Sequence, residues 1–561
     1  MPSKEKRSSL ALYLFFAVLF SIQILPRLSL ESLTNDEPSD ITNGYYFWTR
    51  GDVVTPHNHP PLGSALQALP LLWMNLKTSP FMGDVIDRGH FFIFQWNLDK
   101  LEAITRASRT VSWILGLALG FLIWRVTRAR LMFSIFALFF WAFDPTLSAL
   151  SGLAKTDIAP TFLFFFSVLA FEKAKEEPTI RNSIFAGIAA GLAVNSKFYC
   201  LVLIPVFLIL DFFFYRQTEN VLFLRERRIE IRGRWIHGVG VFLVTTFLLF
   251  LPATLFMPDH HQPFRYVLDK FKEDLVFVRN PFPVYFLGTS GLESHWYYLP
   301  AAFLMKEPIA FLFLLFLGLM LALLGKIKLP FWIWVPPLLF CPALLPSLNL
   351  GVRYLLPLYP FLFLIAAEGS VWLWNGGPVF LTRSFCRTLV LLLFLWQAVS
   401  IVLSYPRMIS YFNEFIPPDK KIQYLADSNL DWGQDQKRLA ELARQRGWTN
   451  VHLAYSGGID PQYYGLNWTP WTEADLAGPQ PGTVYIINAS FLQLGPLAYP
   501  SVKPIAESWI TGMKPTGQVG DSWYYFEVPG KAEASSKGPY LFSAPFLQYR
   551  GYRPFSPLKD P

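Results

Sequence analysis

Apolar and polar residues follow one another in long blocks over the first four hundred positions of the chain. The apolar blocks approach the length of about 20 residues that a helix needs to cross the hydrocarbon core of a membrane. They fall near 9–28, 108–124, 131–147, 158–172, 183–195, 198–215, 236–256, 298–324, 329–346, 352–373 and 388–404. This pattern predicts a polytopic α-helical membrane protein with about eleven spans. A further run at 62–76 is short and flanked by prolines, and predicts an interfacial or re-entrant helix.

After residue 404 the pattern becomes that of ordinary globular sequence. Apolar or alternating segments at 450–458, 483–488 and 522–528 predict β-strands. The stretch DSNLDWGQD (427–435) resembles a calcium loop only in its first positions, because Trp432 and Arg438 replace the required Gly and Glu. We interpret it as the start of a helix that ends at Gly447. The sequence therefore predicts a membrane domain over 1–404 and a small α/β domain over 405–561.

Basic clusters between the apolar runs predict the orientation in the membrane. They occur at 4–7, 125–130, 172–181, 225–234 and 325–328, and at Arg383 and Arg387. Placing all of them on the cytoplasmic side lets eleven spans alternate without contradiction. The predicted protein is therefore a multi-pass protein of the plasma or inner membrane with a cytoplasmic N-terminus. The loop 29–107 and the domain 405–561 then lie on the extracytoplasmic side.

Composition agrees with this class and excludes several others. The chain is 53% hydrophobic and 16% charged, whereas a soluble chain carries about a quarter charged residues. Its net charge of +8 comes from Lys and Arg between the apolar runs, so we predict no nucleic-acid partner. The phosphate-binding loop, the esterase nucleophile motif and the redox Cys pair are all absent from the sequence.

Several charged residues lie at the predicted outer ends of the spans, against the rule that charges avoid the membrane. The cations are Lys155, Lys197, Lys306 and Arg353, and the acids are Asp36, Glu37 and Asp157. Taken singly, the acids are explained by a solvated loop and the cations by anchors that reach the interface. Their gathering on one face favours a polar site instead. Sugar transfer from a lipid phosphate needs such a set, because a carboxylate takes the acceptor proton and cations stabilise the departing phosphate.

Six motifs resemble a known family in the same order along the chain. They are TNDEPSDITNGYYFWTRGDVVTPHNHPPLG (34–63), LAKTDIAP (153–160), GLAVNSKFY (191–199), SHWYYLPAAFLMKEP (294–308), GVRYLLPLYPF (351–361) and YLADSNLDWGQDQKRL (424–439). This set is similar to C-class (GT-C) membrane glycosyltransferases of the protein O-mannosyltransferase and aminoarabinose-transferase superfamily, which is glycosyltransferase family 39-like. The last motif resembles bacterial members with an outer C-terminal domain. The resemblance implies a GT-C-like fold and a polyprenyl-phosphate sugar donor.

The resemblance also implies roles for individual residues. Asp36 matches the catalytic carboxylate, Glu37 supports it or binds a cation, and Asp157 matches a second acidic position. The positions that hold the donor phosphate match Lys197, Lys306, Arg353 and His59.

A metal requirement is left open by the sequence. His260 and His261 follow Asp259 in a predicted outer loop, and one of them could join Asp36 or Glu37 around a divalent cation, since imidazole and carboxylate suit such metals. A surface or acceptor-facing role is the alternative. No cofactor is otherwise implied.

The leading hypothesis is an inverting glycosyltransferase that moves a sugar from a polyprenyl-phosphate donor to a hydroxyl of a protein, lipid or glycan acceptor on the outer face. One alternative is a transporter or flippase of a lipid-linked or anionic substrate. That class places charges near the midplane, often in two related halves, and no internal repeat is evident in this sequence. A second alternative, a membrane scaffold that displays 405–561, requires no charges on the outer face.

Overall fold

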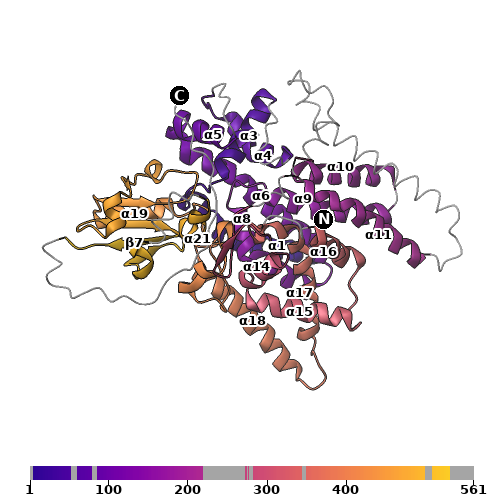
Figure 1. The fold of residues 1–561 in the computed structure, drawn as a ribbon. Helices are drawn as coiled ribbons and strands as arrows, with labels where there is room; N and C mark the ends of the chain where they lie inside the picture. Colours follow the sequence, from indigo (N-terminus) through magenta and orange to yellow (C-terminus); the bar gives the residue numbers. More distant parts are fainter. Residues whose placement is uncertain are drawn as a thin grey trace.

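The computed structural model describes residues 4–51, 60–78, 85–177, 179–218, 282–343, 349–498 and 508–530, with three further residues between 272 and 276. The protein is largely helical, with a small mixed β-sheet near its C-terminal end (Figure 1). His59, His260, His261 and the apolar run 236–256 lie outside the described residues.

Each predicted apolar run within the described residues is helical over most of its length. The helices before residue 219 are α1 (Lys4–Ile24), α2 (Arg27–Leu30), α3 (Glu37–Arg50), α4 (Leu62–Ala68), α5 (Val85–His90), α6 (Leu101–Thr127), α7 (Leu131–Ala142), α8 (Pro145–Ser151), α9 (Ile158–Glu176), α10 (Ile180–Ser196) and α11 (Leu203–Thr218). Those between 298 and 404 are α14 (Tyr298–Lys306), α15 (Ile309–Leu323), α16 (Phe331–Ala343), α17 (Tyr359–Trp374) and α18 (Arg383–Ser404). Short 3-10 turns precede α11 (Phe198–Val202) and α17 (Val352–Leu358).

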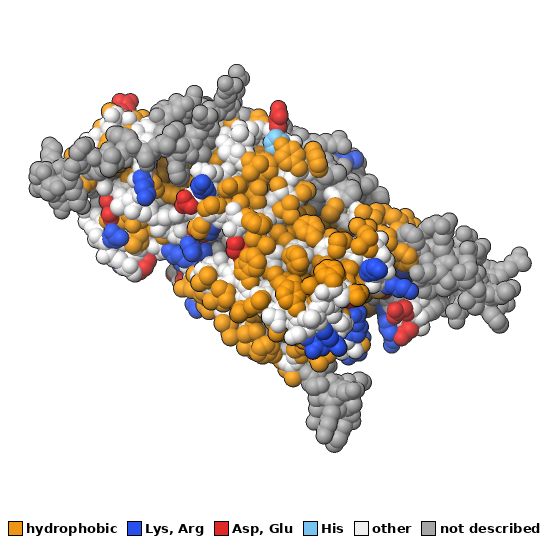
Figure 2. Space-filling model, turned by 90° about the horizontal axis from the view of Figure 1, so that it is seen from below, with side chains coloured by type: hydrophobic (Ala, Val, Ile, Leu, Met, Phe, Trp, Pro, Cys, Tyr) orange, Lys and Arg blue, Asp and Glu red, His pale blue; other side chains and the backbone are white. Residues whose placement is uncertain are grey.

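Several of these helices are long and apolar enough to make this a multi-pass membrane protein. Four in the described part of the chain pass that test: Leu10–Leu30, Leu98–Thr127, Val352–Trp374 and Arg383–Ser404. The pair α7 and α8 makes a fifth if it counts as one span bent by 59°. Figure 2 shows a broad apolar surface on the helical part, with most charged side chains around its edge. Some of the exposed apolar side chains on these helices are expected to contact lipid. They include Leu14, Phe15, Leu392 and Leu395.

Two predicted spans are broken where the sequence supplies helix-stopping residues. The run 298–324 divides at Glu307–Pro308 into α14 and α15, because a proline disfavours helical geometry in the residue before it. The run 131–147 divides after Ala142, where α7 ends, and Asp144 caps α8 by accepting a hydrogen bond from the Leu147 amide at 2.6 Å. The segment Leu62–Trp73 is a short apolar helix. These breaks divide two of the about eleven predicted spans into shorter helices.

The C-terminal part contains a five-stranded sheet in the order β4-β3-β5-β7-β6. Its strands are β3 (Val451–Ala454), β4 (Thr469–Pro470), β5 (Val484–Asn488), β6 (Gly517–Val519) and β7 (Trp523–Glu527). Strand β3 runs parallel to β4 and β5, whereas β7 is antiparallel to β5 and β6. The helices α19 (Gln436–Arg446), α20 (Glu473–Ala477) and α21 (Ala489–Ala498) accompany it. The three predicted strands and the helix stop at Gly447 are confirmed.

A small hairpin connects the helical part to this region. Strands β1 (Val284–Phe286) and β2 (Thr289–Gly291) pair antiparallel, and the Leu287 amide donates to the Tyr424 carbonyl at 2.9 Å. The segment 427–437 continues from there across the first loop: the Ser32 amide donates to the Gln434 carbonyl at 3.1 Å. The C-terminal part thus packs directly on the loop that follows the first span.

Candidate active site

The first loop begins with two adjacent acids that have opposite environments. Asp36 is the residue before α3, and Glu37 is the first residue of that helix. The Asp36 side chain is 35% exposed, whereas that of Glu37 is fully buried. Successive helical residues point about 100° apart, so one acid faces the open side of the loop and the other faces the core.

Glu37 is held by a dense set of donors. Both of its oxygens bind Arg109 of α6, at 2.8 and 2.7 Å, and they also accept hydrogen bonds from the amides of Ala154 at 2.6 Å and Thr34 at 2.7 Å. Burial raises the pKa of Glu37, but Arg109 and these amides lower it, and the net shift is downward. This arrangement favours the supporting role over cation binding, because the oxygens are already occupied.

Arg109 in turn ties the first loop to the second long helix. Its two terminal nitrogens donate to the carbonyls of Leu28, Glu31 and Ser32, at 3.2, 3.0 and 2.7 Å. Together with the Glu37 contacts, these bonds use the whole guanidinium donor set. The sequence contained a signal for this role, since Arg109 is a cation inside the apolar stretch that forms α6.

Three cations surround Asp36 and two further aspartates. Lys155, from the connection between α8 and α9, lies 3.3 Å from Asp36 and also pairs with Asp40 of α3. Arg353 lies 3.8 Å from Asp36 and 3.7 Å from Asp157 through the same nitrogen. Lys197 binds Asp157 at 2.6 Å. We call Asp36, Asp40, Asp157, Lys155, Lys197 and Arg353 the charged cluster.

The charged cluster joins positions that are far apart in the sequence. Asp157 precedes α9, Lys197 follows α10 in extended conformation, and Arg353 opens the turn before α17. All three come from connections that the charge pattern predicts to be on one side of the membrane. Lys155 and Asp40 complete the set. Asp40 could have been found from the sequence, because it lies one helical turn after Asp36 and therefore on the same face of the helix.

Arg353 retains donor capacity that the cluster does not use. Its contacts with Asp36 and Asp157 are long, and within the described residues its buried Nε has no hydrogen-bond partner. A guanidinium with a free edge suits a phosphate, which accepts two parallel hydrogen bonds.

Gly351 allows the turn that contains Arg353 to lie close to the C-terminal part, because a Cβ at this position would lie 2.3 Å from the Ser428 hydroxyl oxygen.

Lys306 does not join the charged cluster. Its Nζ donates to the carbonyls of Ile409 at 2.8 Å and Asn429 at 2.6 Å, and lies 4.6 Å from the ring centre of Phe412. Among the described residues its hydrogen-bond partners are these carbonyls, and it forms no ion pair with a carboxylate. This buried amine fastens the segment 427–429 to α14.

The segment 427–435 covers the charged cluster from the C-terminal side. The Trp432 ring lies 4.4 Å from the Arg353 guanidinium carbon and 5.5 Å from Lys155 Nζ. The helix predicted to follow this segment is present as α19, which begins at Gln436. The acids have tertiary partners: Asp431 accepts hydrogen bonds from the Asn488 side chain and the Ser490 amide, at 2.8 and 3.0 Å.

Asp427 adds a titratable group beside the charged cluster. It adopts a left-handed backbone conformation, with a φ of 55°. Burial raises the pKa of Asp427 to about 6, although Arg353 lowers it, and Asp36 contributes to the increase. Asp427 is therefore largely anionic above pH 6 and protonated below it.

This titration predicts a pH-dependent affinity for an anionic ligand of Arg353. Anionic Asp427 competes for Arg353, so we expect affinity for a phosphodiester to fall as pH rises through about 6. Asp427→Asn is expected to remove this inflection and to keep the low-pH affinity at pH 7.5. The measurement is the dissociation constant of a phosphodiester lipid between pH 5 and 8. An unchanged inflection in the variant would assign it to another group.

The described residues contain no group of three or more His, Cys, Asp or Glu placed to hold a metal ion. Of the candidate metal ligands, only Asp36 and Glu37 are described: the Glu37 oxygens bind Arg109, and Asp36 lies 3.3 Å from Lys155. The metal hypothesis thus stays a prediction for His260 and His261.

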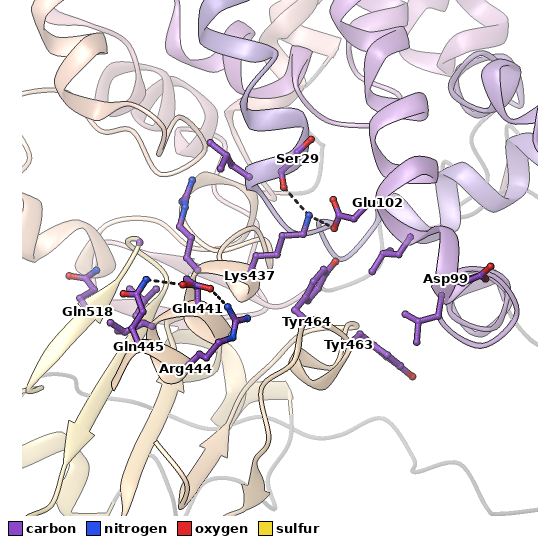
Figure 3. Close-up of a pocket in the computed structure, with 17 residues that line it drawn as sticks. Ser29, Asp99, Glu102, Lys437, Glu441, Arg444, Gln445, Tyr463, Tyr464 and Gln518 are labelled. Atoms are coloured by element: carbon purple, nitrogen blue, oxygen red, sulfur yellow. Dashed lines mark hydrogen bonds and ion pairs between the residues drawn. The ribbon is translucent and has the colours of Figure 1, made fainter. Parts of the chain in front are cut away.

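A separate groove of about 900 Å³ lies between the C-terminal part and the ends of the first two long helices. In Figure 3, Lys437 of α19 reaches across it to Glu102 of α6 and to Ser29. Glu441 binds its own helix neighbours Arg444 and Gln445. The Lys437–Glu102 ion pair crosses the groove, whereas Glu441 pairs within α19. Lys437 therefore serves to dock the C-terminal part on the helical part.

Comparison with known proteins gives one family. Residues 92–254 match the family described as dolichyl-phosphate-mannose-protein mannosyltransferase. The match confirms the resemblance read from the motifs, and it covers those at 153–160 and 191–199, though not the ones that contain Asp36 and Arg353. No curated protein matches the chain.

Two solved structures are similar over most of the chain. ArnT from Cupriavidus metallidurans bound to undecaprenyl phosphate is 12% identical, with 91% of this chain and 97% of that chain covered and a TM-score of 0.44. The oligosaccharyltransferase AglB from Archaeoglobus fulgidus, in complex with an inhibitory peptide and a dolichol-phosphate, is 12% identical, with 81% and 63% covered and a TM-score of 0.46. Similarity at this level carries no argument about residues or substrates.

Proposed function

Because residues 92–254 match the dolichyl-phosphate-mannose-protein mannosyltransferase family, we propose that this membrane protein is an inverting glycosyltransferase with a polyprenyl-phosphate sugar donor. The acceptor is a hydroxyl of a protein, lipid or glycan on the extracytoplasmic side. The observation that carries this proposal is the partly exposed Asp36 carboxylate, which lies between Lys155 and Arg353 while the other two aspartates of the charged cluster are buried.

In the proposed reaction, Asp36 takes the proton from the acceptor hydroxyl. The hydroxyl oxygen forms a bond to the anomeric carbon from the face opposite the phosphate, so the configuration inverts. The bond between that carbon and the phosphate oxygen breaks, and the electron pair leaves with polyprenyl phosphate. The proton remains on Asp36 until solvent removes it.

The cations of the charged cluster stabilise the leaving phosphate in this proposal. Arg353 binds it through the unused edge of its guanidinium, and Lys155 adds a second positive charge. Asp157 and Lys197 fix Arg353 in place, because Asp157 bridges the two cations. We propose Lys155 in the phosphate-binding position expected for Lys306, whose amine is committed to two carbonyls. His59 keeps its proposed place near the phosphate.

The proposed function is tested by transfer of labelled sugar. Membranes that contain the protein are supplied with radiolabelled polyprenyl-phosphate sugars, and the label is followed into protein, lipid and glycan fractions. We expect product only in membranes with the protein. A transporter or flippase would move the labelled donor across the membrane without forming product, and that result would overturn the proposal.

A further inference from the structure

Trp432 connects the C-terminal part to the two cations beside Asp36. Its side chain is 4% exposed, and its ring faces the Arg353 guanidinium at 4.4 Å and Lys155 Nζ at 5.5 Å. Both distances are within the range in which a cation is attracted to an aromatic face. These are also the two cations that approach Asp36 itself, at 3.8 and 3.3 Å.

The backbone around Trp432 is fixed from both sides. The amide of Asn35, the residue before Asp36, donates to the Trp432 carbonyl at 2.9 Å. On the other side, Asp431 binds Asn488 at the end of β5 and Ser490 at the start of α21. Gly433 has a φ of 92°, and a Cβ there would lie 2.9 Å from the Asn35 side-chain oxygen. The sheet therefore holds the indole ring at one place relative to Asp36.

We propose that Trp432 is a positioning residue for the transfer reaction and that the C-terminal part completes the active site through it. This inference rests on the proposed function. The ring offsets the attraction of Arg353 toward Asp36 and Asp157, whose contacts with it are long. It thereby keeps Arg353 available to the donor phosphate, and it packs over Lys155, which is paired with Asp40.

The alternative to this role is simple packing, since a buried Trp also fills space. The two roles differ in what a substitution changes. Leu supplies apolar volume without an aromatic face, whereas Phe keeps the face. A residue that only packs affects stability and all kinetic constants together, but the positioning role predicts a specific effect on the donor.

The experiment compares Trp432→Leu, Trp432→Phe and the control Trp471→Leu in the detergent-solubilised full chain. Trp471 stacks on Trp509 at 5.7 Å in the same region and contacts no member of the charged cluster. We expect Trp432→Leu to lower donor kcat/KM by at least about tenfold, with the acceptor KM unchanged. Trp432→Phe should keep most of the activity, and Trp471→Leu should resemble the wild type. Thermal unfolding of each variant identifies any that fail to fold.

Three results would overturn the inference: full donor kcat/KM in Trp432→Leu, an equal loss in Trp432→Phe, or an equal rise in the acceptor KM. Direct binding of undecaprenyl phosphate separates this inference from the proposed function. If the wild type binds it but transfers no sugar, and Trp432→Leu weakens binding, the proposed function is wrong and only the role of Trp432 in positioning Arg353 for a lipid phosphate stands. If the wild type does not bind it, both proposals are wrong.

Discussion

Asp36→Asn is expected to abolish sugar transfer while leaving the protein folded and inserted. The amide keeps the shape of the side chain but cannot accept the acceptor proton, and loss of a general base lowers turnover by about 10²- to 10⁴-fold. Folding should be little affected because 35% of this side chain is exposed. The measurement is single-turnover transfer from the polyprenyl-phosphate donor with purified protein.

The matched control for this prediction is Asp419→Asn. Asp419 is an exposed acid of the C-terminal part, on the same side of the membrane in the predicted topology. It removes the same charge from a position outside the charged cluster, and its activity should equal that of the wild type. If Asp36→Asn retains more than about a tenth of the activity, another group is the base.

Arg109→Met is expected to give the largest loss of stability. It leaves the fully buried Glu37 without a cation, and breaking a buried ion pair from one side costs about 3–5 kcal/mol in the free energy of unfolding. The carbonyls of Leu28, Glu31 and Ser32 also lose their donor. The measurements are the thermal unfolding midpoint in detergent and the amount of folded protein in the membrane.

A double variant distinguishes the lost pair from lost packing. Glu37→Met combined with Arg109→Met removes both charges and keeps apolar volume, so it should be more stable than Arg109→Met alone. If the double variant is as unstable as the single one, the hydrogen bonds of Arg109 to the loop carbonyls provide the stability. If Arg109→Met unfolds like the wild type, the pair is not a structural support.

Much of the site could be inferred from charged residues at the ends of apolar helices. Asp36, Asp157, Lys197 and Arg353 stand at helix ends where charge is costly, and the structure brings all four together. The same reasoning selected Lys306 and gave Lys155 no specific role. Sequence position cannot separate them, since both are lysines at helix boundaries. Lys306 points to carbonyls of the C-terminal part and Lys155 to two aspartates, and only the fold sets those directions.

The segment 427–435 shows what local sequence rules could not predict. Its acids fit the rule for a helix start, and the helix does follow, from Gln436 to Arg446. However, Asp431 binds the end of a strand nearly sixty residues later, and Trp432 covers Arg353 and Lys155. Local rules evaluate neighbours along the chain, so they cannot detect partners that arrive from another part of the structure.

The sequence by itself determined the helical membrane class, most helix positions, the three main strands and the gathering of charge on one face. Those features depend on local periodicity and on the cost of charge in a bilayer, which act residue by residue. Only the tertiary structure decided that Asp36 is exposed and its neighbour Glu37 buried, and that Trp432 lies over the cations. These outcomes depend on which surfaces pack together, and the packing joins residues separated by more than four hundred positions.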